Sequence, residues 1–294
     1  MIWKNRKWIG YVVYAVLFTG VMLYYRFPDE AFGNYLKVKV NEANPDVILN
    51  FKAVSPSFPL GLRLSDVHVY QRETEAPAVF SARRFDVSPK LGSFLSKTPA
   101  FRFEGHSYGG GIRGLFQFDR MDMSGPFHVT VNLEDLQIEQ YPRIYGFIHR
   151  QISGLLNGRV TYHYTDGGWY EGNGTADLNV SAGEIGLPQP IFGLRTLKLE
   201  QTSLSAVLKA KQIRIQQLVF AGPVVKGGLT GDVLLRNNFF SSRLNLKGTL
   251  EPRKDGLNLK GGSGLLQMLE SHLSGLKRGF VIHGTFSSPV FKFI

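Results

Sequence analysis

The sequence predicts a mainly β protein in which an N-terminal transmembrane helix precedes a long, curved, mostly antiparallel β-sheet structure with about three short helices. Three observations support this prediction: an uncharged segment of 18 residues near the N-terminus, alternating apolar and polar residues along most of the remaining chain, and 33 glycines among 294 residues. Alternation with a period of two is typical of a strand with one buried face and one solvated face. Glycines supply the turns between such strands.

The uncharged segment, Trp8 to Tyr25, predicts a membrane anchor. A helix of this length spans roughly 27 Å at ~1.5 Å per residue, which is close to the ~30 Å hydrocarbon core of a bilayer. Basic residues are more numerous before the segment than after it, so the positive-inside rule places the N-terminus in the cytoplasm. The predicted anchor residues are apolar or aromatic: Trp8, Ile9, Val12, Val16, Leu17, Phe18, Val21, Leu23 and Tyr25.

This pattern predicts a cytoplasmic tail at residues 1–7, an anchor at 8–26 and a β-rich domain across the membrane at 27–294, with a soft boundary near residue 153. A cleaved signal peptide and a buried soluble helix are the alternatives. A signal peptide needs small residues before its cleavage site, whereas this segment ends in bulky residues from Leu23 to Phe27. The sequence therefore favours an uncleaved anchor.

The first element expected after the anchor is a helix that begins near Pro28 and ends before Asn44, because Asp29 and Glu30 complement the positive end of a helix dipole. Strands are then expected wherever apolar residues alternate: 47–51, 62–69, 101–103, 116–118, 129–133, 160–164, 178–180, 197–199, 213–220, 233–235, 244–246, 257–259 and near 281. Helix-spaced apolar residues predict two further helices, at Glu139–Ile152 and Gly264–Lys277.

Many strands with one apolar face need a cover that a few short helices cannot provide. The apolar face must therefore close as a barrel or sandwich, curl into a groove, or meet a ligand or partner. A packed sandwich is the structural alternative to a functional groove. The candidate residues for this apolar groove or core lie on the alternating strands: Leu62, Leu64, Val129, Val131, Leu244, Leu246, Leu257 and Leu259.

Composition and motifs do not favour catalysis. The chain has no cysteine, which excludes disulfides, a thiolate nucleophile and cysteine-ligated metals. The acidic residues are scattered, and the seven histidines form no helical metal-binding pair, so we expect each histidine to be structural or exposed and we assign no catalytic, cofactor or metal site. Gly109–Gly114 matches G-x-G-x-x-G, but strand residues follow it, which favours a hairpin. Asn173-Gly174 also reads as a hairpin turn.

The net charge of +11 indicates either a solvated basic surface or attraction to anionic lipid headgroups or acidic partners. No nucleic-acid-binding motif is present, and nucleic acid is not an expected partner of a domain across the membrane. An outer-membrane β-barrel fits the alternation too, but it would need a cleaved signal and a lipid-facing band.

Three segments carry a family resemblance: F-P-x-x-A-x-x-x-Y-L at 27–36, SPSFPLGLRLSDV at 55–67 and GTFSSPVF at 284–291. With the preceding anchor and the glycine-punctuated β region, the chain resembles the type II secretion system protein N family (GspN) of delta-proteobacterial type. It is more loosely similar to AsmA-like proteins, which are anchored in the inner membrane and rich in β-structure in the periplasm.

The first resemblance implies a non-catalytic accessory component of the type II secretion system, held in the bacterial inner membrane with its bulk in the periplasm and acting through contacts with other secretion proteins. The second implies a curved sheet, an AsmA-like groove or flattened barrel, whose apolar inside holds phospholipid acyl chains. Both imply a membrane-anchored protein with no cofactor. The alternating pattern is compatible with both.

Overall fold

The computed structural model describes residues 26–58, 60–72, 77–144, 151–165, 167, 170–191, 194–253 and 278–294, with residues 8, 10–12, 14, 15, 18, 22 and 24. The chain is mainly β and its strands pair antiparallel, which confirms the predicted fold class at this level. It divides into two compact units, Met1–Ser88 and Pro89–Ile294.

The first unit contains helix α2 and strands β1 to β4. Helix α2 covers Asp29–Ala43, with Asp29 and Glu30 in its first turn, as predicted. Strand β3 (Gly61–Gln71) pairs on one edge with β1 (Val47–Asn50) and β2 (Ala53–Ser57) in succession, and on its other edge with β4 (Phe80–Pro89). The core of the first unit contains four buried strand residues, Val54, Leu64, Val67 and Ala82. Partly buried residues of α2 pack against them.

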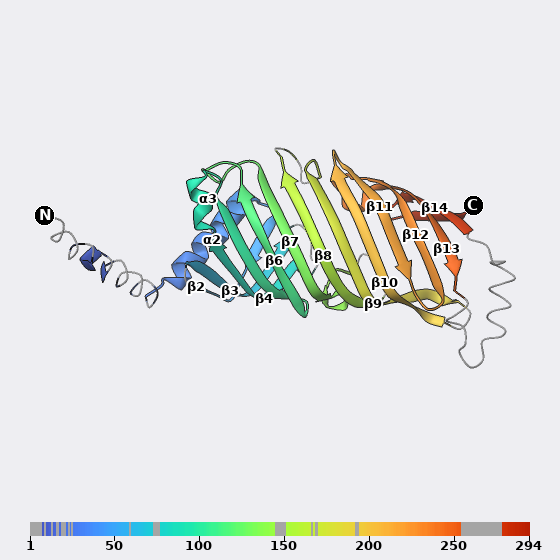
Figure 1. Cartoon of the computed structure of the whole chain (residues 1–294), viewed down its shortest axis with the longest axis horizontal. Helices are drawn as coiled ribbons and strands as arrows, with labels where there is room; N and C mark the ends of the chain where they lie inside the picture. Colours follow the sequence, from blue (N-terminus) through green and yellow to red (C-terminus); the bar gives the residue numbers. More distant parts are fainter. Residues whose placement is uncertain are drawn as a thin grey trace. The chain divides into compact units, whose positions relative to one another are not determined.

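The second unit is built on an antiparallel meander in which each strand pairs with its neighbours in the sequence (Figure 1). A short helix, α3 (Leu91–Leu95), precedes it. The strands are β5 (Ala100–Ser107), β6 (Gly110–Phe118), β7 (Phe127–Gln137), β8 (Ile152–Tyr164), β9 (Asn173–Ile191), β10 (Leu194–Lys209), β11 (Gln212–Ala221), β12 (Val225–Leu234), β13 (Arg243–Pro252), β14 (Arg278–Thr285) and β15 (Pro289–Phe293). Two 3-10 helices, η1 (Ile138–Gln140) and η2 (Phe239–Ser241), lie between strands.

The glycine-rich segment at 109–114 forms a hairpin, as predicted. Tyr108 and Gly109 both have positive φ angles, 49° and 74°, between β5 and β6. Two consecutive residues of positive φ are typical of the type I′ turn, whose twist matches that of paired strands. The following glycines then lie in β6 and not at the start of a helix, so this motif is not a dinucleotide site.

The pairing of β7 with β8 is interrupted by a bulge. The register shifts between Leu133 and Leu136, and Asp135 within that interval has a φ of 51°. The Asn157 side chain closes the bulge, because it accepts a hydrogen bond from the Asp135 N–H at 3.0 Å and donates one to the Asp135 carboxylate at 2.9 Å. A bulge of this kind bends its strand and increases the local twist.

Most sequence predictions of strands are confirmed, but three details differ. The expected helix at Glu139–Ile152 differs at its two ends, because Glu139 lies in the 3-10 helix η1 and Ile152 begins β8. Between them Ile144 is helical, and residues 145–150 lie outside the described residues. The predicted turn at Asn173-Gly174 is wrong, because both residues lie in β9. Strands β2, β4 and β15 and helix α3 were not predicted. The expected helix at Gly264–Lys277 and the strand at 257–259 lie outside the described residues.

The predicted anchor is described only in part. Trp8, Val12 and Phe18 are helical and exposed, with 72%, 42% and 50% of their surface accessible. Ile9, Val16, Leu17, Val21, Leu23 and Tyr25 lie outside the described residues. Among the residues that are described, no helix combines the length and apolar character needed to cross a membrane. The predicted soft boundary at residue 153 falls in β8, inside the second unit.

Candidate functional site

One face of the second unit's sheet is apolar across consecutive strands. Leu178, Leu204, Leu218 and Leu229 are register partners in turn on β9, β10, β11 and β12. Residues directly opposite each other on paired strands point to the same face, so the four leucines form one row. A second row, with three aromatic residues and one valine, crosses β5 to β8 in the same way: Phe101, Phe116, Val129 and Tyr162.

The leucine row is only half-buried. Leu178, Leu204, Leu218 and Leu229 all have intermediate exposure. All described strands of this unit belong to one sheet, so within the described residues no separate second sheet packs on this face. A sheet face without a second layer leaves apolar surface exposed to solvent. A ligand or partner can cover that surface.

The apolar face is more deeply buried on β12 and β13. Val233, Leu235, Leu244 and Leu246 form a core cluster, to which Tyr170 and Phe239 also contribute partly buried rings. Each of the four is no more than 8% exposed. The sheet therefore has a packed region around β12 and β13 and a half-exposed apolar region on β9 to β11.

Aromatic residues extend the apolar surface toward β7 and β8. Phe127 stacks on Tyr164 with ring centroids 5.0 Å apart, and it also stacks on Phe116 at 4.6 Å. Burial raises the pKa of Tyr162 above its ordinary value, and the neighbouring Tyr164 adds to this effect. This part of the face therefore disfavours the charged form of the tyrosine side chain.

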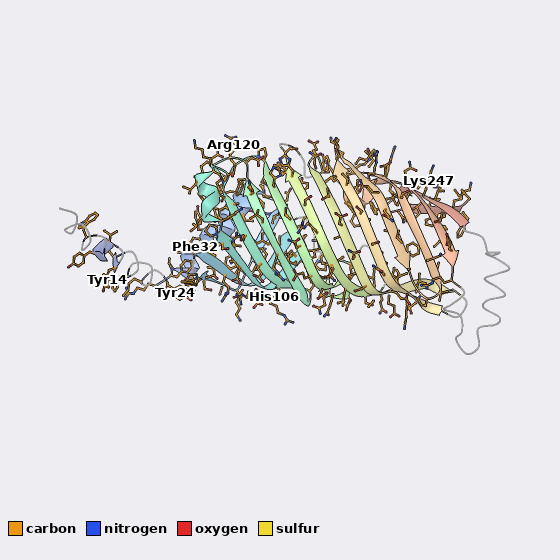
Figure 2. All side chains as sticks on the ribbon, viewed as in Figure 1. Tyr14, Tyr24, Phe32, His106, Arg120 and Lys247 are labelled. Atoms are coloured by element: carbon orange, nitrogen blue, oxygen red, sulfur yellow. The ribbon has the colours of Figure 1, made fainter. Side chains whose placement is uncertain are left out.

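The opposite face is polar and carries ion pairs between neighbouring strands. Arg214 on β11 pairs with Asp232 on β12 at 3.0 Å, and Lys226 on β12 pairs with Glu251 on β13 at 3.0 Å. Lys247, labelled in Figure 2, is exposed, whereas its neighbour Leu246 on β13 is buried. Such surface pairs contribute at most ~1 kcal/mol each, so their main effect is to keep this face solvated.

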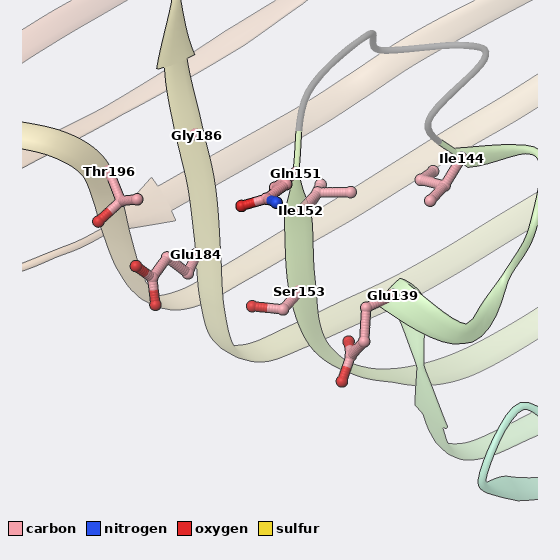
Figure 3. Close-up of a pocket in the computed structure, with 8 residues that line it drawn as sticks. All are labelled: Glu139, Ile144, Gln151, Ile152, Ser153, Glu184, Gly186 and Thr196. Atoms are coloured by element: carbon pink, nitrogen blue, oxygen red, sulfur yellow. The ribbon is translucent and has the colours of Figure 1, made fainter. Parts of the chain in front are cut away.

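A pocket of about 470 Å³ lies where β8, β9 and β10 approach η1 (Figure 3). Its lining is mixed in character: Glu139, Ile144, Gln151, Ile152, Ser153, Glu184, Gly186 and Thr196. Glu139 and Glu184 lie on either side of Ser153. The Glu139 carboxylate accepts a hydrogen bond from the Gly154 N–H at 3.2 Å and so supports the bulge at the start of β8. The pocket suits a small polar group better than an acyl chain.

The residues predicted for an apolar groove or core fall in both units. Val129 and Val131 lie on β7 with intermediate exposure, and Leu244 and Leu246 are buried on β13. Leu62 and Leu64 lie on β3, in the separate core of the first unit. Leu257 and Leu259 lie outside the described residues. The half-exposed row on β9 to β12 was not singled out from the sequence, although alternation at Leu178, Leu218 and their neighbours could have indicated it.

No protein-family model, curated protein or solved structure matches this chain. The functional conclusion therefore depends on the geometry of the sheet and on the chemistry of its residues.

Proposed function

We propose that the chain is a non-catalytic, membrane-attached protein that binds phospholipid acyl chains on the apolar face of its second unit. The observation that carries this proposal is the in-register row Leu178, Leu204, Leu218 and Leu229, which is apolar yet half-exposed. The predicted anchor at Trp8–Tyr25 would hold this face near its lipid source, the inner membrane of a bacterium. The looser resemblance to AsmA-like proteins supports the same function.

The energetics favour an acyl chain as ligand. Each methylene transferred from water to an apolar surface contributes ~0.8 kcal/mol, so several methylenes lying along a leucine row give useful affinity without a polar anchor. In this proposal the sheet curls around the chain as a groove, and the headgroup stays in water. The net positive charge favours anionic headgroups at the rim of such a groove.

The experiment is lipid analysis of the full chain purified in a mild detergent. We expect mass spectrometry to find stoichiometric phospholipid, and we expect Leu218→Gln to reduce it severalfold. Val219→Gln is the matched control, because Val219 is the next residue on β11 and is exposed. Thermal unfolding of both variants checks that they fold. Lipid-free protein, or equal lipid in the two variants, would contradict the proposal.

A second candidate is the accessory role in type II secretion, acting through protein contacts. One observation favours it: β15 is exposed along its whole length and ends the strand order, with β14 as its neighbour. An edge strand of this kind can pair with a strand of a partner. Co-purification with type II secretion components in mild detergent, lost when the chain ends at residue 288, would support this role. Unchanged co-purification would locate the contact elsewhere.

A further inference from the structure

Three potential metal ligands meet on the polar face of the second unit. His128 on β7 and His163 on β8 are direct register partners. Asp119 follows β6, two residues beyond Gln117, which is itself the register partner of His128. Residues two apart on an extended chain share a face, so the Asp119 side chain lies on the same face as both histidines.

The position of Asp119 is fixed by its backbone. The Asp119 N–H donates a hydrogen bond to the Pro126 carbonyl at 3.1 Å, which continues the β6–β7 ladder past the end of β6. The carboxylate is therefore held beside the two strands that carry the histidines. Residues 120–125 form the loop that this hydrogen bond closes.

The ligand atoms are close together. One carboxylate oxygen of Asp119 lies 3.3 Å from His128 Nε2, and the other lies 3.5 Å from His163 Nε2. The two imidazole rings stack with their centroids 3.8 Å apart and 9° between their planes. One ligand atom from each of the three residues lies within 4.8 Å of the other two.

One of these atoms lacks a hydrogen-bond partner. Among the described residues, His163 Nε2 is inaccessible to solvent and makes no hydrogen bond. A buried polar atom without a hydrogen-bond partner costs about 1–3 kcal/mol of folding stability, so a ligand that contacts it would be stabilising. A metal ion between His163, His128 and Asp119 would satisfy it.

We propose that Asp119, His128 and His163 bind a divalent transition-metal ion of the zinc class. Zinc bonds imidazole nitrogen at ~2.0–2.1 Å and carboxylate oxygen at ~2.0–2.2 Å, so tetrahedral ligand atoms lie ~3.4 Å apart. The two separations between Asp119 and the histidines, each measured from a different carboxylate oxygen, are close to that value. The two parallel rings need to tilt toward each other, and their exposure, 52% for His128 and 34% for His163, leaves room for this.

The ligand set selects the metal. Two imidazoles favour zinc, copper or nickel over magnesium and calcium, which prefer oxygen ligands. The ion would join the end of β6 to β7 and β8 and would hold water in its remaining position, because all three side chains are partly exposed. The site lies on the face opposite the leucine row, so it is independent of lipid binding.

The test is calorimetric titration of the full chain in mild detergent with zinc chloride. We expect saturable binding of one zinc ion per chain and a rise in Tm with zinc, because a ligand that binds only the folded state stabilises it. Magnesium chloride at the same concentration should leave Tm unchanged. Cobalt(II) should give the visible absorption of a tetrahedral ion.

The variants Asp119→Asn and His163→Gln should weaken zinc binding by more than about 10-fold, since even the outer partners of metal ligands contribute 10- to 100-fold. His283→Gln is the matched control, because His283 is exposed on β14 and lies outside the cluster. Circular dichroism verifies that each variant folds. The proposal is overturned if the unmodified chain shows no saturable zinc binding, or if His283→Gln weakens binding as much as the ligand variants do.

Discussion

Val233 on β12 and Leu244 on β13 are register partners, and only 3% and 8% of their surfaces are exposed. They lie at the centre of the core cluster of the second unit. Leu204 on β10 and Leu218 on β11 are also register partners, but both side chains are only half-buried. One apolar face therefore serves two purposes: it packs the fold around β12 and β13, and it offers a surface on β9 to β11.

The packed region should respond to truncation of a single side chain. We expect Leu244→Ala to reduce the free energy of unfolding by about 2–4 kcal/mol, because it removes a buried side chain and leaves a cavity. Urea denaturation followed by circular dichroism measures this change. Leu234→Ala is the control, since Leu234 is 47% exposed and should change stability by no more than ~0.5 kcal/mol. Equal effects of the two variants would contradict the assignment of faces.

The strands could be predicted from the sequence because apolar and polar residues alternate along each of them. Val129 and Val131 alternate with Thr130 and Asn132, and the structure places this segment in β7. The bulges could not be predicted in this way, because a residue such as Asp135 is unusual in its backbone conformation and not in its side chain. Helix spacing overextended the predicted helix at its C-terminal end, because Ile152 belongs to the alternation of β8 and pairs with β9.

A glycine lies next to the bulge between β7 and β8, where Gly158 is the register partner of Leu133. Gly158 has a φ of 153°, and a Cβ there would lie 2.3 Å from the Asp177 carbonyl oxygen. We expect Gly158→Ala to destabilise the protein by more than ~1 kcal/mol, because an L side chain is strained at this φ and meets backbone. Thermal unfolding measures the loss. Gly92→Ala in α3 is the control, since a Cβ there meets nothing within 4 Å, and alanine favours helix by up to ~1 kcal/mol.

The Asp119–His128–His163 cluster shows what the sequence could not reveal. The three residues are separated along the chain by a loop and by most of two strands, and no fixed spacing connects them. They meet only because β7 and β8 pair in the register that sets His128 opposite His163. Knowledge of that register would have been needed to find the cluster.

The ion pairs of the first unit should make its stability depend on pH. Burial alone would raise the pKa of Asp86, but hydrogen bonds from Arg63 and Arg84 and their positive charges lower it by more, so the net shift is downward. The Arg63 and Arg84 nitrogens lie 2.7 and 2.6 Å from the Asp86 carboxylate. A carboxyl whose pKa is lowered on folding stabilises the protein above its unfolded pKa, and this contribution disappears as the pH falls through the folded pKa.

We therefore expect Asp86→Asn to be less stable than the unmodified chain at pH 7. The difference should shrink as the pH falls below about 4, where the unfolded carboxyl takes up its proton. Urea titrations from pH 7 to pH 3 measure it. A difference that stays constant over this range would show that the carboxylate charge is not the source of the stabilisation.

The chain has no native cysteine, so the reactivity of a single introduced cysteine reports how accessible each face of the sheet is. Leu246 and Lys247 are neighbours on β13, and they point to opposite faces because side chains alternate along a strand. Leu246 is 8% exposed and Lys247 is exposed, so a thiol reagent should modify Leu246→Cys much more slowly than Lys247→Cys. In denaturant both thiols become accessible, and the two rates should converge. Similar rates in the folded protein would mean that β13 does not separate a packed face from a solvated one. The assignment of the leucine row to the same apolar face would then be wrong.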